Sequence, residues 1–183
     1  ASAYISRLVS RGYKVALCEQ VEDPSVAKGI VKRDVVKVIT PGTFIDGNSD
    51  NDYKNLYIMS IYGANNVYGI AVSDISTGEF KTTYFTESIE NLLAEIARFS
   101  PKEIIVDINL SQKILDRINE SSSALITKKD FNTFNCNDEE LRSQFITLDL
   151  ESLNHNSKVA VSVLLKYIYD TQKISLSNID LLE

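Results

Sequence analysis

The chain has 183 residues, of which 44% are hydrophobic and 24% are charged, as in an ordinary globular protein. This length allows one full domain and part of a second, or two small domains, with a core that needs no disulfide support. Two cysteines and one histidine form neither a disulfide framework nor a metal-ligand spacing, so we expect a reduced, cytoplasmic setting. No apolar run approaches the roughly 20 residues that a membrane span needs.

The net charge of −6 argues against a protein that binds nucleic acid over its whole surface. The charge is unevenly distributed, however. Residues 1–45 carry seven Lys or Arg and four Asp or Glu, a net charge of +3, whereas the rest of the chain carries −9. This asymmetry predicts different partners for the two parts of the chain.

The first 45 residues are expected to form a helix and two strands. Apolar residues at helical spacing predict a helix over residues 4–9, which Gly12 ends. Residues 13–17 and 35–39 are rich in strand formers, and Asp23-Pro24 predicts a short helix between them. Because the first helix begins at once and no initiator methionine precedes it, we expect a segment cut from a longer polypeptide.

Residues 46–54 are almost wholly polar and turn-forming, so we interpret them as a linker. Three expected strands then follow, at residues 55–62, 67–74 and 79–85, and form an antiparallel meander. The remaining pattern alternates helices (89–97, 111–118, 138–145 and 157–169) with a buried parallel strand at 103–107 and a short strand at 125–126. We therefore expect an α/β fold whose mixed sheet carries helices on its faces, which is the order of an RNase H-like domain.

Several motifs resemble the MutS family of DNA mismatch-repair proteins. The first part contains, in order, the family's Y-x-x-x-L-x-x-x-G helix from Tyr4, a V-A-x-C-E-Q strand from Val15, D-P at Asp23, K-G at Lys28, R-x-V-V at Arg33 and T-P-G-T at Thr40. Further along, D-I-S-T-G-E-F (residues 74–80) and Y-x-x-D-T-Q-K (residues 167–173) resemble the family's connector domain. The resemblance covers essentially the whole chain and is densest over residues 4–43.

The resemblance implies a domain plan and a function. Residues 1–45 would end an incomplete α/β mismatch-recognition domain, and residues 46–54 would be the linker. Residues 55–174 would form an RNase H-like connector domain, and residues 175–183 would lead into the next domain. The family clamps double-stranded DNA as a homodimer, recruits the partner protein MutL and hydrolyses ATP with Mg²⁺. Its Gly-x-Phe-Tyr-Glu mismatch wedge and its phosphate-binding loop do not occur in this chain. We therefore expect a non-catalytic connector without a cofactor of its own.

Two sets of residues are the candidate binding sites under this reading. Lys28, Lys32 and Arg33 precede the second strand, where their cations could contact DNA phosphates without reading sequence. Glu139 and Glu140 lie on an acidic helix that resembles the MutL docking position, although glutamates stand where the family would have amides. The alternative for both sets is a solvated, charged surface.

A nuclease is the alternative function. In RNase H-like nucleases, acidic residues from strands and a helix hold two metal ions for phosphodiester hydrolysis. Asp74, Glu90 and Asp107 are the acids that this reading would use. Cys18 is expected to be a buried small hydrophobe rather than a nucleophile, and His155 a surface or capping residue.

Overall fold

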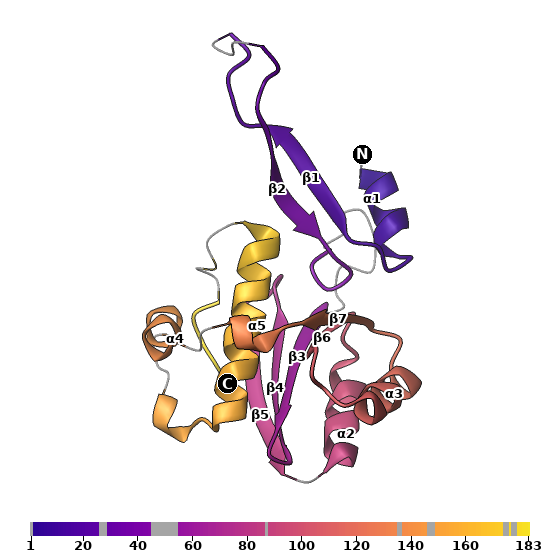
Figure 1. Cartoon of the computed structure of the whole chain (residues 1–183), viewed down its shortest axis with the longest axis vertical. Helices are drawn as coiled ribbons and strands as arrows, with labels where there is room; N and C mark the ends of the chain where they lie inside the picture. Colours follow the sequence, from indigo (N-terminus) through magenta and orange to yellow (C-terminus); the bar gives the residue numbers. More distant parts are fainter. Residues whose placement is uncertain are drawn as a thin grey trace.

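The computed structural model describes residues 2–25, 29–44, 55–86, 88–134, 137–145, 149–173, 176 and 179–183. The expected linker at 46–54 lies outside the described residues. Among the described helices, none combines the length and the hydropathy that a membrane span requires. Figure 1 shows a hairpin and a short helix projecting from a larger unit that is built around a sheet.

The N-terminal segment, residues 2–44, contains α1 (Ser2–Val9), β1 (Val15–Gln20) and β2 (Arg33–Ile39). The two strands form an antiparallel pair, with a bulge between Leu17 and Cys18. The helix expected to begin at Asp23-Pro24 is absent from residues 23–25, where the Asp23 carboxylate instead accepts hydrogen bonds from Ser25 and closes a turn. The expectation that Cys18 is buried is wrong: its side chain is exposed, because Val15 and Leu17 take the more covered positions of the alternating strand.

The larger unit, residues 55–183, contains a five-stranded sheet in the order β5-β4-β3-β6-β7. The meander is β3 (Tyr57–Ala64), β4 (Val67–Asp74) and β5 (Glu79–Thr86), and all of its pairings are antiparallel. Parallel strands β6 (Glu103–Asp107) and β7 (Leu125–Lys129) follow on the other side of β3. The sheet is therefore mixed, as the sequence predicts, and every residue of β6 is buried.

Helices cover both faces of this sheet (Figure 1). On one face lie α2 (Ile89–Phe99) and α3 (Gln112–Ser121), and on the other lies the long helix α5 (His155–Gln172), with α4 (Asp138–Gln144) beside it. Strand alternation sends Met59 and Ile104 into the core under α2 and α3, and Ile58 and Ile105 into the core under α5. Ile105 faces α5, and side chains alternate along a strand, so Glu103 also lies on the α5 side of the sheet.

α5 packs very closely on β4. A Cβ atom added at Gly69 would lie 2.2 Å from the backbone carbonyl atoms of Asn156, so only glycine allows the helix to approach this near. The Asn156 side chain donates hydrogen bonds to the backbone carbonyls of Ala64 (3.0 Å) and Val67 (2.7 Å) and so anchors the first turn of α5 to the β3–β4 turn. This contact fixes the position of the first turn of α5 on the sheet and therefore also the position of its C-terminal end.

Candidate functional site

The expected DNA-contacting residues lie at the far end of the β1–β2 hairpin. Arg33 is the first residue of β2 and is paired with Gln20, and both are exposed. Lys32 is also exposed, and its backbone N–H donates to the Glu22 carboxylate at 3.0 Å. Lys28 lies outside the described residues. Two cationic side chains are thus directed into solvent at one end of an extended hairpin.

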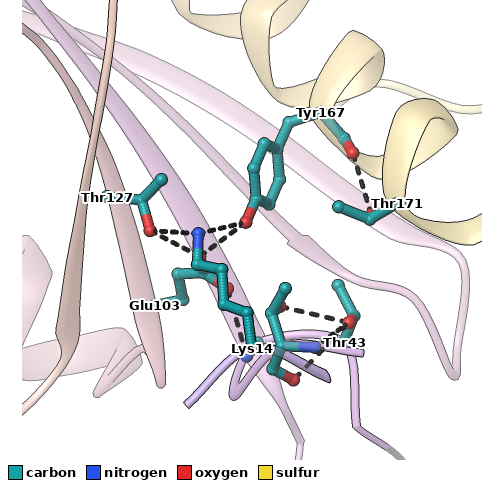
Figure 2. Close-up of polar contacts among 8 residues, drawn as sticks. Lys14, Thr43, Glu103, Thr127, Tyr167 and Thr171 are labelled. Atoms are coloured by element: carbon teal, nitrogen blue, oxygen red, sulfur yellow. Dashed lines mark hydrogen bonds and ion pairs between the residues drawn. The ribbon is translucent and has the colours of Figure 1, made fainter. Parts of the chain in front are cut away.

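The other end of the hairpin meets the sheet unit. Val15 pairs with Ile39 there, five residue steps from the Gln20–Arg33 pair, a span of about 17 Å at the usual rise of a strand. Lys14 lies immediately before β1, and a turn at residues 40–43 follows β2. Side chains and backbone of these two stretches contact the first residues of β6, Thr127 of β7 and the C-terminal half of α5 (Figure 2).

A buried carboxylate is the centre of this contact. Glu103 opens β6 and is fully buried, and its Oε1 lies 2.9 Å from the Lys14 ammonium. The hydroxyls of Thr127 on β7 and Tyr167 on α5 donate to the same oxygen at 2.6 and 2.7 Å. Lys14 in turn donates to both hydroxyls at 2.8 Å, so four polar groups form a closed set (Figure 2). We call the residues around this carboxylate the junction cluster: Lys14, Thr40, Gly42, Thr43, Glu103, Thr127 and Tyr167.

The turn at residues 40–43 completes the junction cluster. The Thr40 N–H donates to the Thr43 hydroxyl at 2.9 Å, and both threonines are buried. The Gly42 N–H points to Glu103 Oε2 at 3.4 Å. A Cβ atom at Gly42 would come within 2.9 Å of the Glu103 Cβ and 3.1 Å of the Ile58 Cβ, so glycine is required for this approach. The T-P-G-T motif is thus a tight turn that docks on the start of β6.

The electrostatics of the junction cluster favour an ionised Glu103. Burial alone would raise the pKa of this carboxyl, but the charge of Lys14 and hydrogen bonds from Thr127, Thr40 and Tyr167 outweigh it and hold the pKa below its ordinary value. For Tyr167, burial and then the neighbouring carboxylate raise the pKa, so the phenol keeps its proton and acts as a donor. The junction cluster is consequently an ion pair between a buried carboxylate and a partly exposed ammonium group, and hydroxyl donors also bond to the carboxylate.

The three acids of the nuclease alternative do not converge. Asp74 ends β4 and lies opposite Tyr57 at the start of β3, whereas Asp107 lies at the far end of β6, about 17 Å further along the sheet. Asp74 accepts hydrogen bonds from Ser76 and Leu56, and Asp107 accepts them from Asn109 and Phe131, so both carboxylates close local turns.

The third acid, Glu90, is exposed on α2 and faces Arg117 at 3.8 Å. Within the described residues, no group of three or more potential ligands is arranged to hold a metal ion. The geometry therefore gives the nuclease alternative no support.

The acidic residues expected to contact a partner lie on α4. Glu139 and Glu140 occupy its first turn, where the Asn137 side chain caps the helix by accepting from the Glu139 N–H at 2.9 Å. Both glutamates are exposed, and Glu140 borders a groove of about 740 Å³ between α4 and α5. His155 is exposed at the start of α5, but Asn154 is the capping residue there.

Lys14, Glu103 and Tyr167 are the functional candidates that the sequence analysis did not single out. The sequence carries a signal for one of them, because a glutamate at the head of a buried parallel strand is expensive to bury without a cation. The sequence does not indicate which cation supplies that charge, since Lys14 and Glu103 lie on different segments.

Comparisons with known proteins agree on one family. Residues 56–180 match the family model MutS domain II, and residues 1–48 match MutS domain I. The chain is 57% identical over its full length to a DNA mismatch repair protein MutS of Clostridium beijerinckii, of which it covers 20%. It is also 57% identical to one of a type B strain of Clostridium botulinum and 47% identical to one of Clostridium perfringens, with 19% and 20% of those proteins covered. The chain thus spans about a fifth of the length of these relatives.

Proposed function

Because the chain belongs to the MutS family, by the match of residues 56–180 to MutS domain II, we propose that it is a non-catalytic connector within a DNA mismatch-repair protein. In this proposal residues 1–45 end the mismatch-recognition domain, residues 46–54 are the linker, residues 55–174 form an RNase H-like connector domain, and residues 175–183 lead to the next domain. The strand order β5-β4-β3-β6-β7, with only β4 antiparallel to both of its neighbours, supports the RNase H-like arrangement.

The observation that carries the proposal is the direct contact between the hairpin and the sheet unit. A segment that relays the state of bound DNA to a distant ATPase has to transmit force across the junction of its two parts. The junction cluster joins them through the Lys14–Glu103 ion pair and a docked turn, and the cations Lys32 and Arg33 lie about 17 Å away at the other end of the same hairpin. A displacement of the hairpin tip by DNA would therefore be carried to β6 and α5.

The role of the cations can be tested by the salt dependence of DNA binding in the whole mismatch-repair protein. Each lost phosphate contact should reduce the slope of log K against log salt by about 0.9. We expect the Lys32→Gln/Arg33→Gln double variant to lower this slope and to weaken binding to matched and mismatched duplexes equally. Lys166→Gln, an exposed lysine on α5, is the matched control and should leave the slope unchanged. An unchanged slope in the double variant would remove these two residues from the DNA interface.

The isolated chain should bind DNA weakly and without preference for a mismatch, because the wedge motif is not part of it. A gel-shift titration with matched and mismatched duplexes measures this. Tight, mismatch-selective binding would contradict the proposal that this chain is a connector without its own recognition element.

We also propose that Glu139 and Glu140 contribute to MutL docking, since both are exposed in the first turn of α4 and Glu140 borders the α4–α5 groove. Charge reversal of the pair, Glu139→Lys with Glu140→Lys, should weaken recruitment of MutL by the DNA-bound whole protein. Glu120→Lys, an exposed acid at the end of α3, serves as the control. Normal recruitment by the reversed pair would eliminate this docking site.

A further inference from the structure

The two charges of the junction cluster belong to different segments of the chain. The carboxylate and both hydroxyl donors, on Glu103, Thr127 and Tyr167, belong to the sheet unit. The cation, Lys14, belongs to the N-terminal segment. If that segment moves away, the two hydroxyls stay with Glu103 and the compensating positive charge leaves.

The two charges would respond differently to such a separation. The Lys14 side chain is already 35% exposed, so water can solvate its ammonium group when it leaves. Glu103 is fully buried in the docked chain, where the turn at residues 40–43 forms part of its cover, and undocking removes this turn together with the Lys14 cation. The pKa of Glu103, which Lys14 and Thr40 help to hold low in the docked chain, then rises, so undocking favours uptake of a proton by this carboxylate.

We propose that Lys14 and Glu103 form an electrostatic latch, in which undocking of the N-terminal segment from the sheet unit is coupled to protonation of Glu103. The latch is a conformational device of the chain itself and does not depend on whether the hairpin contacts DNA. The latch is tested at Lys14 and Glu103, whereas the proposed function is tested by DNA binding at the hairpin tip and by MutL recruitment at α4, so failure of one can be told apart from failure of the other.

The groups that face Glu103 are the ones that set this coupling. Lys14 faces it from the residues before β1, Tyr167 from α5, Thr127 from β7, and the turn at 40–43 from the end of β2. A further cation, the Lys129 ammonium on β7, lies 5.8 Å from the centre of the Tyr167 ring. Lys129 is exposed and stays with the sheet unit on undocking, so it is the group that would partly replace Lys14.

The sign of the pH dependence follows from this arrangement. In the docked chain the pKa of Glu103 is lowered, so the latch is fully formed at neutral pH. It weakens once the pH falls below the pKa of the undocked carboxyl and is lost below that of the docked one. In a Lys14→Met variant, burial acts without the cation and raises the pKa of Glu103. That carboxyl then contributes most stability at acid pH, and its contribution is lost as the pH rises.

The test compares four forms of the full chain: wild type, Lys14→Met, Glu103→Gln and the double variant. Urea unfolding at several pH values between 4 and 8 gives the pH dependence, and the difference between each form and its Glu103→Gln counterpart isolates the carboxyl. Native-state hydrogen exchange of the Thr43 and Gly42 amides reports opening of the junction, after correction for intrinsic exchange. Lys81→Met, which removes the cation of a partly exposed pair with Glu79, is the matched control.

The latch predicts three results. Lys14→Met should raise the opening of the junction by about tenfold or more at neutral pH, because it leaves a buried charge unpaired. The Glu103→Gln change should reverse part of that loss when added to Lys14→Met. The contribution of Glu103 to stability should fall with decreasing pH in the wild type and rise with decreasing pH in Lys14→Met.

Additive effects of the two substitutions, or the same direction of pH dependence with and without Lys14, would overturn the proposal. If Lys14→Met does not fold, the comparison of wild type with Glu103→Gln decides alone. Opening of the junction must then increase at acid pH in the wild type and lose that dependence in Glu103→Gln.

Discussion

We expect Gly69→Ala to cause a large loss of stability, although it adds only one methyl group. In Gly69→Ala the new methyl group would lie 2.2 Å from the carbonyl carbon and oxygen of Asn156 and 2.5 Å from the Ser157 nitrogen. These are backbone atoms in the first turn of α5, so no side chain can rotate away. Since ordinary contacts of a Cβ begin near 3.4 Å, the helix must move from β4 by at least about 1 Å.

Overpacking that side chains can absorb lowers the free energy of unfolding by about 1–3 kcal/mol. In Gly69→Ala the clash is with backbone atoms, so we expect a loss of at least about 3 kcal/mol. With a urea m-value of about 2 kcal/mol/M for a chain of this size, the unfolding midpoint should fall by about 1.5 M. Gly63→Ala is the control, because its methyl group would meet the Tyr68 ring and Leu110 Cδ1 at 3.1–3.2 Å, which are side chains that can shift. A midpoint for Gly69→Ala within about 0.3 M of the wild type would refute the reasoning.

Three further substitutions probe other contacts by the same urea assay. Asn156→Ala should lower the free energy of unfolding by about 2 kcal/mol, because two carbonyls of the β3–β4 turn lose the hydrogen bonds from the Asn156 side chain. A loss below about 0.5 kcal/mol would show that water replaces this donor. Tyr167→Phe should cost about 1–2 kcal/mol and move acid unfolding to higher pH, since Glu103 loses a donor to its ionised form; an unchanged acid transition would contradict this. Leu92→Ala should cost about 3 kcal/mol through a cavity under α2 while hydrogen exchange at the 40–43 turn stays unchanged; faster exchange there would mean that the two faces of the sheet are coupled.

The sheet could be predicted from the sequence because its signals are local. Runs of strand-forming residues separated by short turns define β3, β4 and β5, and an apolar run after Pro101 defines β6. The β3–β4 turn is formed by Asn65 and Asn66, both at positive φ, which asparagine tolerates better than most residues. Such patterns depend on a few neighbouring residues, so they can be recognised without knowledge of the tertiary structure.

Helix ends were less accurately predicted, for identifiable reasons. α5 was expected over 157–169 and runs over His155–Gln172, because Asn154 caps it earlier and Lys173, at φ 56°, ends it where a glycine would be the usual signal. Asp23-Pro24 has a helix-start pattern, but the Asp23 carboxylate bonds to Ser25 and forms a turn instead. A capping residue satisfies nearby N–H groups in a turn as well as in a helix, so the pattern does not distinguish them.

The junction cluster could not be predicted because its members are distant in the chain. The motifs that carry the family resemblance do contain two of its parts, the turn at 40–43 and Tyr167. Their contact with Glu103 and Lys14 depends on how α5 crosses β4 at Gly69 and how the hairpin leaves β6. These are properties of packing rather than of sequence pattern.

The distance along the chain between Lys14 and Tyr167 also has a consequence for protein synthesis. These two residues are 153 positions apart, and Lys14 leaves the ribosome first. At usual elongation rates of about 5–20 residues per second, Lys14 is synthesised roughly 8–30 s before Tyr167. During that interval the apolar and cationic side chains of the hairpin, together with the unfinished sheet, are accessible to chaperones and to neighbouring nascent chains. Slow translation between β7 and α5 would lengthen this exposure, so codon choice in that stretch should influence the yield of correctly folded protein.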